Sequence, residues 1–254
     1  WINNFHMAIR QRLDLLLVER QLAPSRERAQ SLILAGKVLV NTERVDKPGK
    51  SVNQDSELVV QAKDHPYVSR GGVKLAGAIR EFQIEVLDRI ALDVGASTGG
   101  FTDCLLQHGA QKVYTVDVGY GQLAWKLRQD PRVINLERTN IRYLEPVNLA
   151  DPIQLVVVDA SFISLRLILP KLYELMTAGS QLLALVKPQF EAGRKEVGKG
   201  GRVKEEAVHA RVLHEIIEAA TSLGFKMLGS CESSIQGKKS QNTEYFVHVE
   251  KFSK

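Results

Sequence analysis

The sequence predicts an α/β protein: a doubly wound, mostly parallel sheet of seven strands that ends in an antiparallel edge hairpin, preceded by a small α+β unit. From residue 71 onward, short apolar runs typical of buried strands alternate with helical patterns, as in a parallel sheet. The last two apolar runs have no helix between them, as in an antiparallel hairpin. The first 60-odd residues lack this alternation and form a separate pattern.

The small unit combines two helices with strands. Its second helix begins at Ser25, a good N-cap residue, and stops at Gly36, which suits the position just after a helix. Pro48 and Gly49 indicate a turn between the strands. We expect helices over 12–19 and 25–35 and strands over 37–41 and 52–60, in a unit at residues 8–62 that a linker at 63–70 follows.

The large unit, residues 71–254, contains the alternating pattern. Five stretches have helical periodicity, and seven are short and strongly apolar. We expect helices over 71–82, 100–108, 122–128, 165–175 and 203–222, and strands over 89–94, 112–116, 132–136, 155–158, 181–186, 225–231 and 243–250.

Composition narrows the class of protein. Two cysteines are too few for a disulfide framework or a cysteine-based zinc site, the six histidines are scattered, and we expect no metal. The sequence contains no apolar run of about 18 residues and no signal-peptide pattern, so we expect translation to start at Met7 and a reduced, cytoplasmic protein without a membrane partner. The net charge of +5 and the basic stretch 187–204 favour a polyanionic partner.

A glycine-rich turn is the most specific local motif. Residues 93–101, Asp-Val-Gly-Ala-Ser-Thr-Gly-Gly-Phe, follow an apolar strand and open a helix, where glycines let a nucleotide-like ligand approach the backbone. Asp117 ends the next strand about 20 residues later, where an acid suits a ribose diol. A tight strand-to-helix turn with an acidic cap is the alternative.

Four charged residues lie at the ends of predicted elements. Lys74 begins a helix, Asp159 and Lys187 end apolar strands, and Glu244 begins the final strand. Because the carboxyl ends of parallel strands meet at one crevice, we expect these side chains to share a cleft with the ligand. Each residue by itself could simply be a solvated strand end.

These motifs resemble those of known families. The glycine turn resembles motif I of Rossmann-like S-adenosylmethionine methyltransferases, and the four charged residues resemble the Lys-Asp-Lys-Glu tetrad of the FtsJ/RrmJ-like ribose 2′-O-methyltransferases. The first 60-odd residues resemble the small RNA-binding domain first defined in ribosomal protein S-four. Together, the two parts resemble the TlyA family, also called haemolysin A, from about Arg10 to Phe252.

The resemblance implies 2′-O-methylation of cytidine in ribosomal RNA, with S-adenosylmethionine as the cofactor and ribosomal RNA or ribosomal subunits as the partner. It assigns the catalytic set to Lys74, Asp159, Lys187 and Glu244. It assigns cofactor binding to Asp93, Gly95, Ala96, Ser97, Gly99, Gly100 and Phe101, with Asp117 on the ribose and Asn140 facing the adenine. We assign RNA binding to Arg12, Arg26, Arg28, Lys37, Arg70, Arg194 and Lys195, and expect the loop 193–204 to close over the RNA backbone.

The chemistry explains these residue types. A ribose hydroxyl must lose its proton as it attacks, and a lysine can accept that proton only when its pKa falls well below about 10.4. We expect Lys187 to deprotonate or orient the hydroxyl, Lys74 to steady the oxyanion, and the two acids to orient the lysines. Which lysine takes the proton stays open.

Other functions stay open at this point. Enzymes that methylate exocyclic base nitrogens carry an Asn/Asp-Pro-Pro-aromatic motif, whereas the segment from Asp159 to Phe162 has no prolines. A non-catalytic RNA-binding ribosome-assembly factor and a haemolytic, membrane-active protein are the alternatives from other classes. The sequence does not define the methylated nucleotide, the subunit or the oligomeric state.

Overall fold

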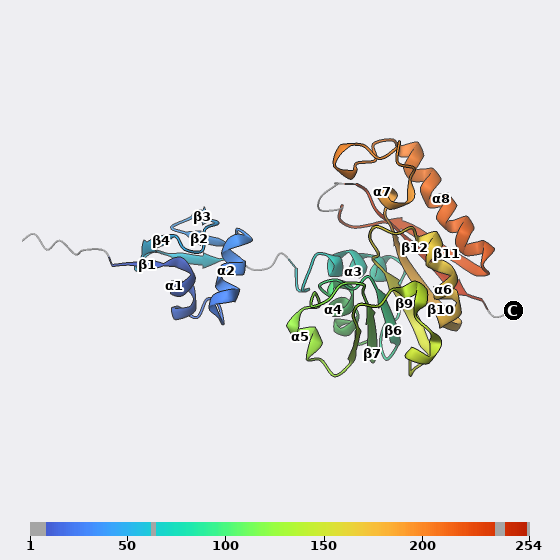
Figure 1. Ribbon diagram of the computed structural model, residues 1–254, viewed down its shortest axis with the longest axis horizontal. Coiled ribbons are helices and arrows are strands. Elements are labelled where there is room, and N and C mark those ends of the chain that lie inside the picture. Colours follow the sequence, from blue (N-terminus) through green and yellow to red (C-terminus); the bar gives the residue numbers. More distant parts are fainter. Residues whose placement is uncertain (1–8, 62–64, 237–241, 253–254) are drawn as a thin grey trace, which may run out of the picture. The chain divides into compact units, whose positions relative to one another are not determined.

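The computed structural model describes residues 9–61, 65–236 and 242–252 (Figure 1). The chain divides into two compact units, residues 1–66 and 67–254. The expected start at Met7 lies outside the described residues, as do residue 8, residues 62–64 and residues 253–254 at the limits of the expected domains and linker.

The small unit contains two helices and two small antiparallel sheets. Ser25 Oγ accepts the backbone N–H of Arg28 and caps the second helix, which Gly36 ends with a φ of +66°. Strands β1 and β4 form one sheet, and strands β3, β2 and β5 form the other. The elements are β1 (Arg10–Arg12), α1 (Leu13–Glu19), α2 (Arg26–Leu34), β2 (Val38–Val40), β3 (Glu43–Val45), β4 (Ser51–Asn53) and β5 (Leu58–Val60).

Seven strands of the large unit form one sheet in the order β11-β12-β10-β9-β6-β7-β8, and β12 is antiparallel to both of its neighbours. This confirms the predicted fold class. The strands are β6 (Ile90–Val94), β7 (Lys112–Val116), β8 (Val133–Leu136), β9 (Ile153–Val158), β10 (Met176–Val186), β11 (Phe225–Glu232) and β12 (Tyr245–Lys251). The helices are α3 (Gly71–Glu81), α4 (Gly100–Gln107), α5 (Trp125–Arg128), α6 (Leu169–Leu175), α7 (Pro188–Glu191) and α8 (Glu206–Ser222), with short 3₁₀ turns at 141–143, 146–148, 165–167 and 199–201.

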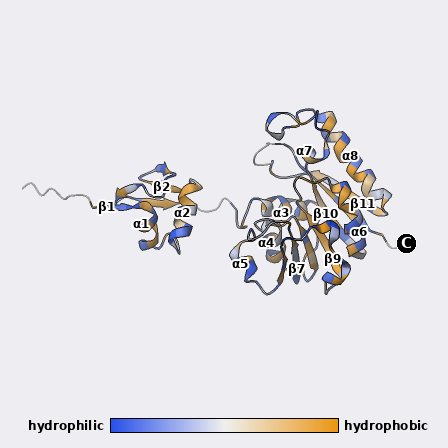
Figure 2. Ribbon diagram, in the orientation of Figure 1, coloured by the Kyte–Doolittle hydropathy of each residue, from blue (hydrophilic) through white to orange (hydrophobic). Residues whose placement is uncertain are grey.

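Both faces of this sheet are buried. On one face Leu75 of α3 and Leu105 of α4 pack with the strands, and on the other Leu172 of α6 and Val212 of α8 do so. Figure 2 shows the apolar residues gathered along the strands between these helices. The strand ends therefore provide the exposed polar positions, and the carboxyl ends of β6, β7, β9 and β10 lie at the same edge as the start of β12.

Several elements differ from the predicted ones. The expected helix over 165–175 is a 3₁₀ turn followed by α6, because Pro170 has a fixed φ and no N–H and therefore belongs in a first helical turn. Helix α8 starts at Glu206 rather than at residue 203, since the N–H of Val203 donates to the side chain of Asn242. Within the described ranges, no helix has the length and apolar character needed to cross a membrane.

Candidate active site

The glycine turn between β6 and α4 brings two strand ends together. Gly95 has a φ of +82°, and a Cβ atom there would lie 2.8 Å from the carbonyl oxygen of Asp159. The turn can therefore lie against the end of β9 only with a glycine at this position. Gly99, with a φ of +90°, is the N-cap residue that precedes α4.

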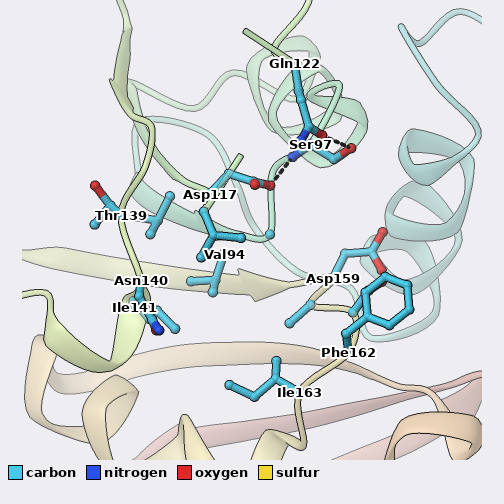
Figure 3. A pocket seen from close by; sticks show the side chains of 15 residues that line it. Val94, Ser97, Asp117, Gln122, Thr139, Asn140, Ile141, Asp159, Phe162 and Ile163 are labelled. Atoms are coloured by element: carbon cyan, nitrogen blue, oxygen red, sulfur yellow. Dashed lines mark hydrogen bonds between the residues drawn. The ribbon is translucent and has the colours of Figure 1, made fainter. Parts of the chain in front are cut away.

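A cavity of about 540 Å³ opens beside this turn, at the carboxyl ends of β6, β7 and β9 (Figure 3). This volume is in the range of small-molecule sites. Its wall is largely apolar, with a few polar groups between. The lining residues are Val94, Gly95, Ser97, Val116, Asp117, Val118, Gln122, Thr139, Asn140, Ile141, Asp159, Ala160, Ser161, Phe162 and Ile163.

Asp117 is held in place within this cavity. One carboxylate oxygen accepts the backbone N–H of Ser97 at 2.7 Å, and the other accepts that of Gly119 at 2.7 Å. Ser97 also donates from its hydroxyl to the side chain of Gln122 at 3.3 Å, as Figure 3 shows. The fixed carboxylate keeps lone pairs for ligand hydroxyl groups.

The hydrogen-bonding groups along the cavity fit S-adenosylmethionine. Acceptors lie along the cavity in Asp117, Asn140 and Asp159, and this cofactor offers ribose hydroxyls, amino groups and a sulfonium cation. The apolar wall includes Val118 and Ile141, which suits an adenine ring. These residues could hold the cofactor without a metal ion, and the described residues contain no group of three or more His, Cys, Asp or Glu side chains that could bind one.

The other residues expected to bind the cofactor lie outside the cavity lining: Asp93, Ala96, Gly99, Gly100 and Phe101. Asp93 is fully buried and accepts the hydroxyl of Thr102 at 2.6 Å, while its second oxygen has no hydrogen-bond partner within the described ranges. Burial, with a smaller contribution from the carboxylate of Asp159, raises the pKa of Asp93 to about 7 against the opposing effect of the hydrogen bond from Thr102. Phe101 instead packs against Phe246, with ring centroids 6.1 Å apart.

The four charged residues form two ion pairs. Lys187 Nζ lies 2.6 Å from Asp159 Oδ1 and donates to Ser161 Oγ at 2.9 Å. Lys74 Nζ lies 2.5 Å from Glu244 Oε2. Val186 is opposite Tyr245 in the last pair of the β10–β12 register, so continuing the register by one residue places Lys187 opposite Glu244. Both pairs therefore lie at the edge where the cavity opens.

Sequence reasoning missed a pair of aromatic rings beside this edge. Phe162 lines the cavity, has a φ of +64° and is 91% exposed, and its ring centroid is 5.0 Å from that of Phe190. Lys187 Nζ lies 5.9 Å from the Phe190 ring. A bulky residue with a positive φ and an exposed ring is uncommon and is a feature of functional sites. The sequence did contain a signal for this feature, the aromatic residue Phe162 three positions after Asp159.

The basic residues expected to bind RNA are largely exposed. In the small unit, Asp14 is completely buried, and its carboxylate accepts hydrogen bonds from the side chains of Arg12, Arg26 and Gln30. The exposed set is Arg12, Arg26 and Arg28 of the small unit and Arg70, Arg194 and Lys195 of the large unit, whereas Lys37 is partly buried.

The loop 193–204 is attached to the large unit at its far end. Asn242, which is nearly buried, accepts the N–H of Val203 at 3.0 Å and donates to the carbonyl of Gly201 at 2.8 Å. The same side chain donates to Gln189 in α7 at 2.9 Å. Asn242 therefore ties the glycine-rich end of this loop to a position two residues before Glu244.

Comparison with known proteins identifies relatives of both units. The FtsJ-like methyltransferase profile matches residues 67–251, and the S4 domain profile matches residues 11–58. A candidate rRNA methyltransferase of Bacillus subtilis, YqxC, is 51% identical over 94% of this chain and 85% of its own length. The 16S/23S rRNA (cytidine-2′-O)-methyltransferase TlyA of Mycobacterium tuberculosis is 47% identical over 95% of this chain and 90% of its own length. A solved structure of a candidate hemolysin of Streptococcus thermophilus is 45% identical, with a TM-score of 0.75 over 97% of this chain and 90% of that one.

Proposed function

The chain belongs to the FtsJ-like methyltransferase family and carries an S4 domain, and on this premise we propose that it transfers a methyl group from S-adenosylmethionine to the ribose 2′-hydroxyl of a cytidine in ribosomal RNA. The arrangement of two lysine–carboxylate pairs beside the cavity supports this proposal most directly. The named activity of the M. tuberculosis relative supports the choice of cytidine and ribosomal RNA.

The cofactor would lie in the cavity. Asp117 would accept the ribose hydroxyls, Asn140 would face the adenine, and Asp159 would lie toward the sulfonium end, where a carboxylate balances the positive charge. The bound cofactor supplies an electrophilic methyl group. The glycine turn would lie beside it, because Gly95 lets the turn pack directly against the end of β9 and both Gly95 and Ser97 line the cavity.

Lys187 would act on the attacking hydroxyl. Asp159 and Ser161 fix its nitrogen, and a neutral Lys187 amine beside the 2′-hydroxyl would take the proton as the oxygen attacks. Lys74, held by Glu244, would stabilise the negative charge that develops on that oxygen. Because each lysine has its own carboxylate partner, both nitrogens have a defined position before the RNA arrives.

The RNA would be held by charge and by stacking. Arg12, Arg26 and Arg28 of the small unit would meet phosphates, and their contribution should weaken as salt rises. In the large unit, the exposed ring of Phe162 provides a face for an unstacked base next to Lys187. A flipped cytidine stacked there would have its ribose near the ion pairs.

The test is methyl transfer from labelled S-adenosylmethionine to ribosomal subunits, followed by mapping of 2′-O-methylated riboses. We expect the label on cytidine ribose. Lys187→Ala should lower the transfer rate by about 10²–10⁴-fold, the usual contribution of general acid–base catalysis, with little change in cofactor affinity. Lys112→Ala is the matched control, because Lys112 pairs with Asp151 at the opposite edge of the sheet.

The alternative functions predict other results. A non-catalytic assembly factor would bind subunits and leave the ribose unmethylated in both the wild type and the variant. Methyl label on a base nitrogen would overturn the choice of the ribose hydroxyl. Lysis of erythrocytes by the purified protein, unaffected by Lys187→Ala, would favour the membrane-active alternative.

A further inference from the structure

Glu191, the last residue of α7, is a buried acid that the proposed chemistry does not use. It is only 7% exposed. Its Oε2 accepts the hydroxyl of Ser164 at 2.5 Å, and its Oε1 accepts the backbone N–H of Leu165 at 2.7 Å. Burial raises the pKa of Glu191, against the opposing effect of these two hydrogen bonds. A buried carboxylate is costly unless such bonds compensate for it, so its presence needs a reason.

The partners of Glu191 lie at the far end of the segment that begins with Asp159. This segment, 159–165, is fixed at its start by the N–H of Asp159, which donates to the carbonyl of Val94 at 2.9 Å. Lys187 then contacts Asp159 and Ser161. Glu191 contacts the other end. The segment is therefore held by Lys187, which immediately precedes the single turn of α7, and by Glu191, which is its last residue.

Phe162, in the middle of the segment, contacts the ring of Phe190. Phe162 is 91% exposed and adopts a positive φ, which costs energy for an aromatic residue. Arg166, just beyond the segment, donates to the main-chain carbonyl of Glu191 at 3.1 Å and so adds to the attachment at the same end. Without the Glu191 carboxylate, the 164–165 end of the segment would lose both of its hydrogen bonds to that side chain and keep only the Arg166 contact with the main chain and the packing of Ile163 and Leu165.

We propose that Glu191 is a positioning residue: it holds the 159–165 segment so that Asp159 and Ser161 keep Lys187 Nζ in its reactive position. This inference rests on the proposed function. Glu191 does not line the cavity, and it acts through Asp159 and Ser161 rather than on the substrate. The short helix α7 therefore links the two residues that hold the 159–165 segment, Lys187 before its first residue and Glu191 at its end.

The first test compares Glu191→Ala with Glu191→Gln in single-turnover methyl transfer at saturating cofactor and ribosomal subunits. Glu191→Ala should lower the rate at least tenfold. Glu191→Gln should stay within threefold of the wild type, because its amide oxygen can accept from Leu165 while its amide N–H donates to Ser164 Oγ. Asp151→Ala is the control: it removes an acid that holds Lys112 and Tyr114 at the opposite sheet edge and should leave the rate unchanged.

A double variant separates positioning from a general loss of structure. If Glu191 acts through the contacts of Asp159 and Ser161 with Lys187, its loss should cost nothing once the Lys187 side chain is absent. Glu191→Ala combined with Lys187→Ala should therefore be no slower than Lys187→Ala alone. A double variant slower than Lys187→Ala, or a Glu191→Ala enzyme with the wild-type rate, would overturn the proposal.

A structural readout keeps this test separate from that of the proposed function. Hydrogen exchange should show faster exchange of the 160–165 amides in Glu191→Ala and wild-type protection in Glu191→Gln. Unchanged protection in Glu191→Ala would overturn the positioning role, whatever the activity. A wild-type protein that fails to methylate ribosomal RNA would overturn the proposed function instead, and the positioning proposal would fall with it. If Glu191→Ala does not fold, Glu191→Gln together with Ser164→Ala provides the comparison.

Discussion

The small and large units each bury an aspartate completely, yet the two carboxyl groups behave in opposite ways. In the small unit, the hydrogen bonds from Arg12 hold the pKa of Asp14 well below its usual range, helped by Gln30 and Arg26 and opposed by burial. In the large unit, burial raises the pKa of Asp93 to about 7. Its hydrogen-bond partner there is the hydroxyl of Thr102.

The difference shows that burial by itself does not set the charge of an acid. Asp14 has its cations within the unit, so Arg12 and Arg26 are held in fixed orientations while about half of each side chain stays exposed. The charged neighbours that act on Asp93 are the carboxylates of Asp159 and Asp117. The carboxyl ends of these strands therefore carry an excess of acidic side chains. That excess complements a cationic ligand, whereas the small unit complements an anionic one.

The largest effect should come from Asp93→Asn. Because the folded-state pKa of Asp93 is raised, the folded protein holds this proton more tightly than the unfolded chain, and wild-type stability should fall as pH rises from about 4 to about 7. Asp93→Asn has no ionisable group at this position, so its stability should not fall in this way. The difference in unfolding free energy between variant and wild type should therefore grow by an amount on the order of 4 kcal/mol over that window. Denaturant unfolding at pH 4, 6 and 8 measures it, without cofactor. A constant difference across these pH values would contradict the raised pKa.

Asp14→Asn should have a smaller effect of the opposite kind. The folded-state pKa of Asp14 is lowered, so its stabilising contribution is present above about pH 4 and is lost only as pH falls through the folded pKa. We expect the variant to lose about 1–3 kcal/mol at pH 7, the usual contribution of hydrogen bonds to a charged group. Hydrogen exchange of the amides of α1 and α2 in the full chain checks this. Protection equal to that of the wild type would contradict the stabilising contribution of Asp14.

Arg26→Ala should weaken binding to ribosomal RNA by about three- to tenfold and reduce the slope of log affinity against log salt by about one. The reason is the loss of one phosphate contact. The matched control is Glu27→Ala, the next residue along α2, which removes a negative charge and should not weaken binding. Filter binding at several salt concentrations provides both numbers. An unchanged slope would exclude Arg26 from the phosphate contacts.

The smallest effect is a proton balance. A cationic cofactor beside Asp159 and Asp117 should lower the pKa of Asp93, so that cofactor binding near pH 6.5 releases a fraction of one proton. Calorimetry in two buffers with different ionisation enthalpies measures this release. Asp93→Asn should abolish it. Binding heats that do not depend on the buffer in the wild type would remove Asp93 from the electrostatics of the site.

Local patterns were sufficient to predict much of the fold. Ser25 and Gly36 define α2 because capping and left-handed φ values are properties of single residues. The apolar run 155–158 predicted a buried strand, observed as β9, because both faces of a parallel sheet are covered. Strand β3, an edge strand that pairs with β2, was missed because Glu43 and Arg44 are charged and exposed and give it no apolar pattern. Strand β10 starts five residues earlier than expected, because Thr177, Ala178 and Gly179 are small and exposed and separate the buried Met176 from the apolar run that follows.

The sequence predicted only those contacts of the site that follow from the order of the strands in the sheet. Asp159 and Lys187 end neighbouring parallel strands, so their proximity follows from the strand order. The role of Glu191 depends on which loop α7 faces, and no local pattern encodes its contacts with Ser164 and Leu165. The exposed ring of Phe162 depends on a single backbone angle, which propensity does not predict for an aromatic residue.

The place of β12 in the sheet has a consequence during synthesis. This strand is the last of the seven to leave the ribosome, yet it inserts between β10 and β11 rather than adding to an outer edge. Until it is translated, β10 presents an unpaired edge, and Lys74 has no Glu244 to meet. A nascent chain therefore cannot assemble the second ion pair, and this end of the sheet gains both of its lysine–carboxylate pairs only after β12 has been translated.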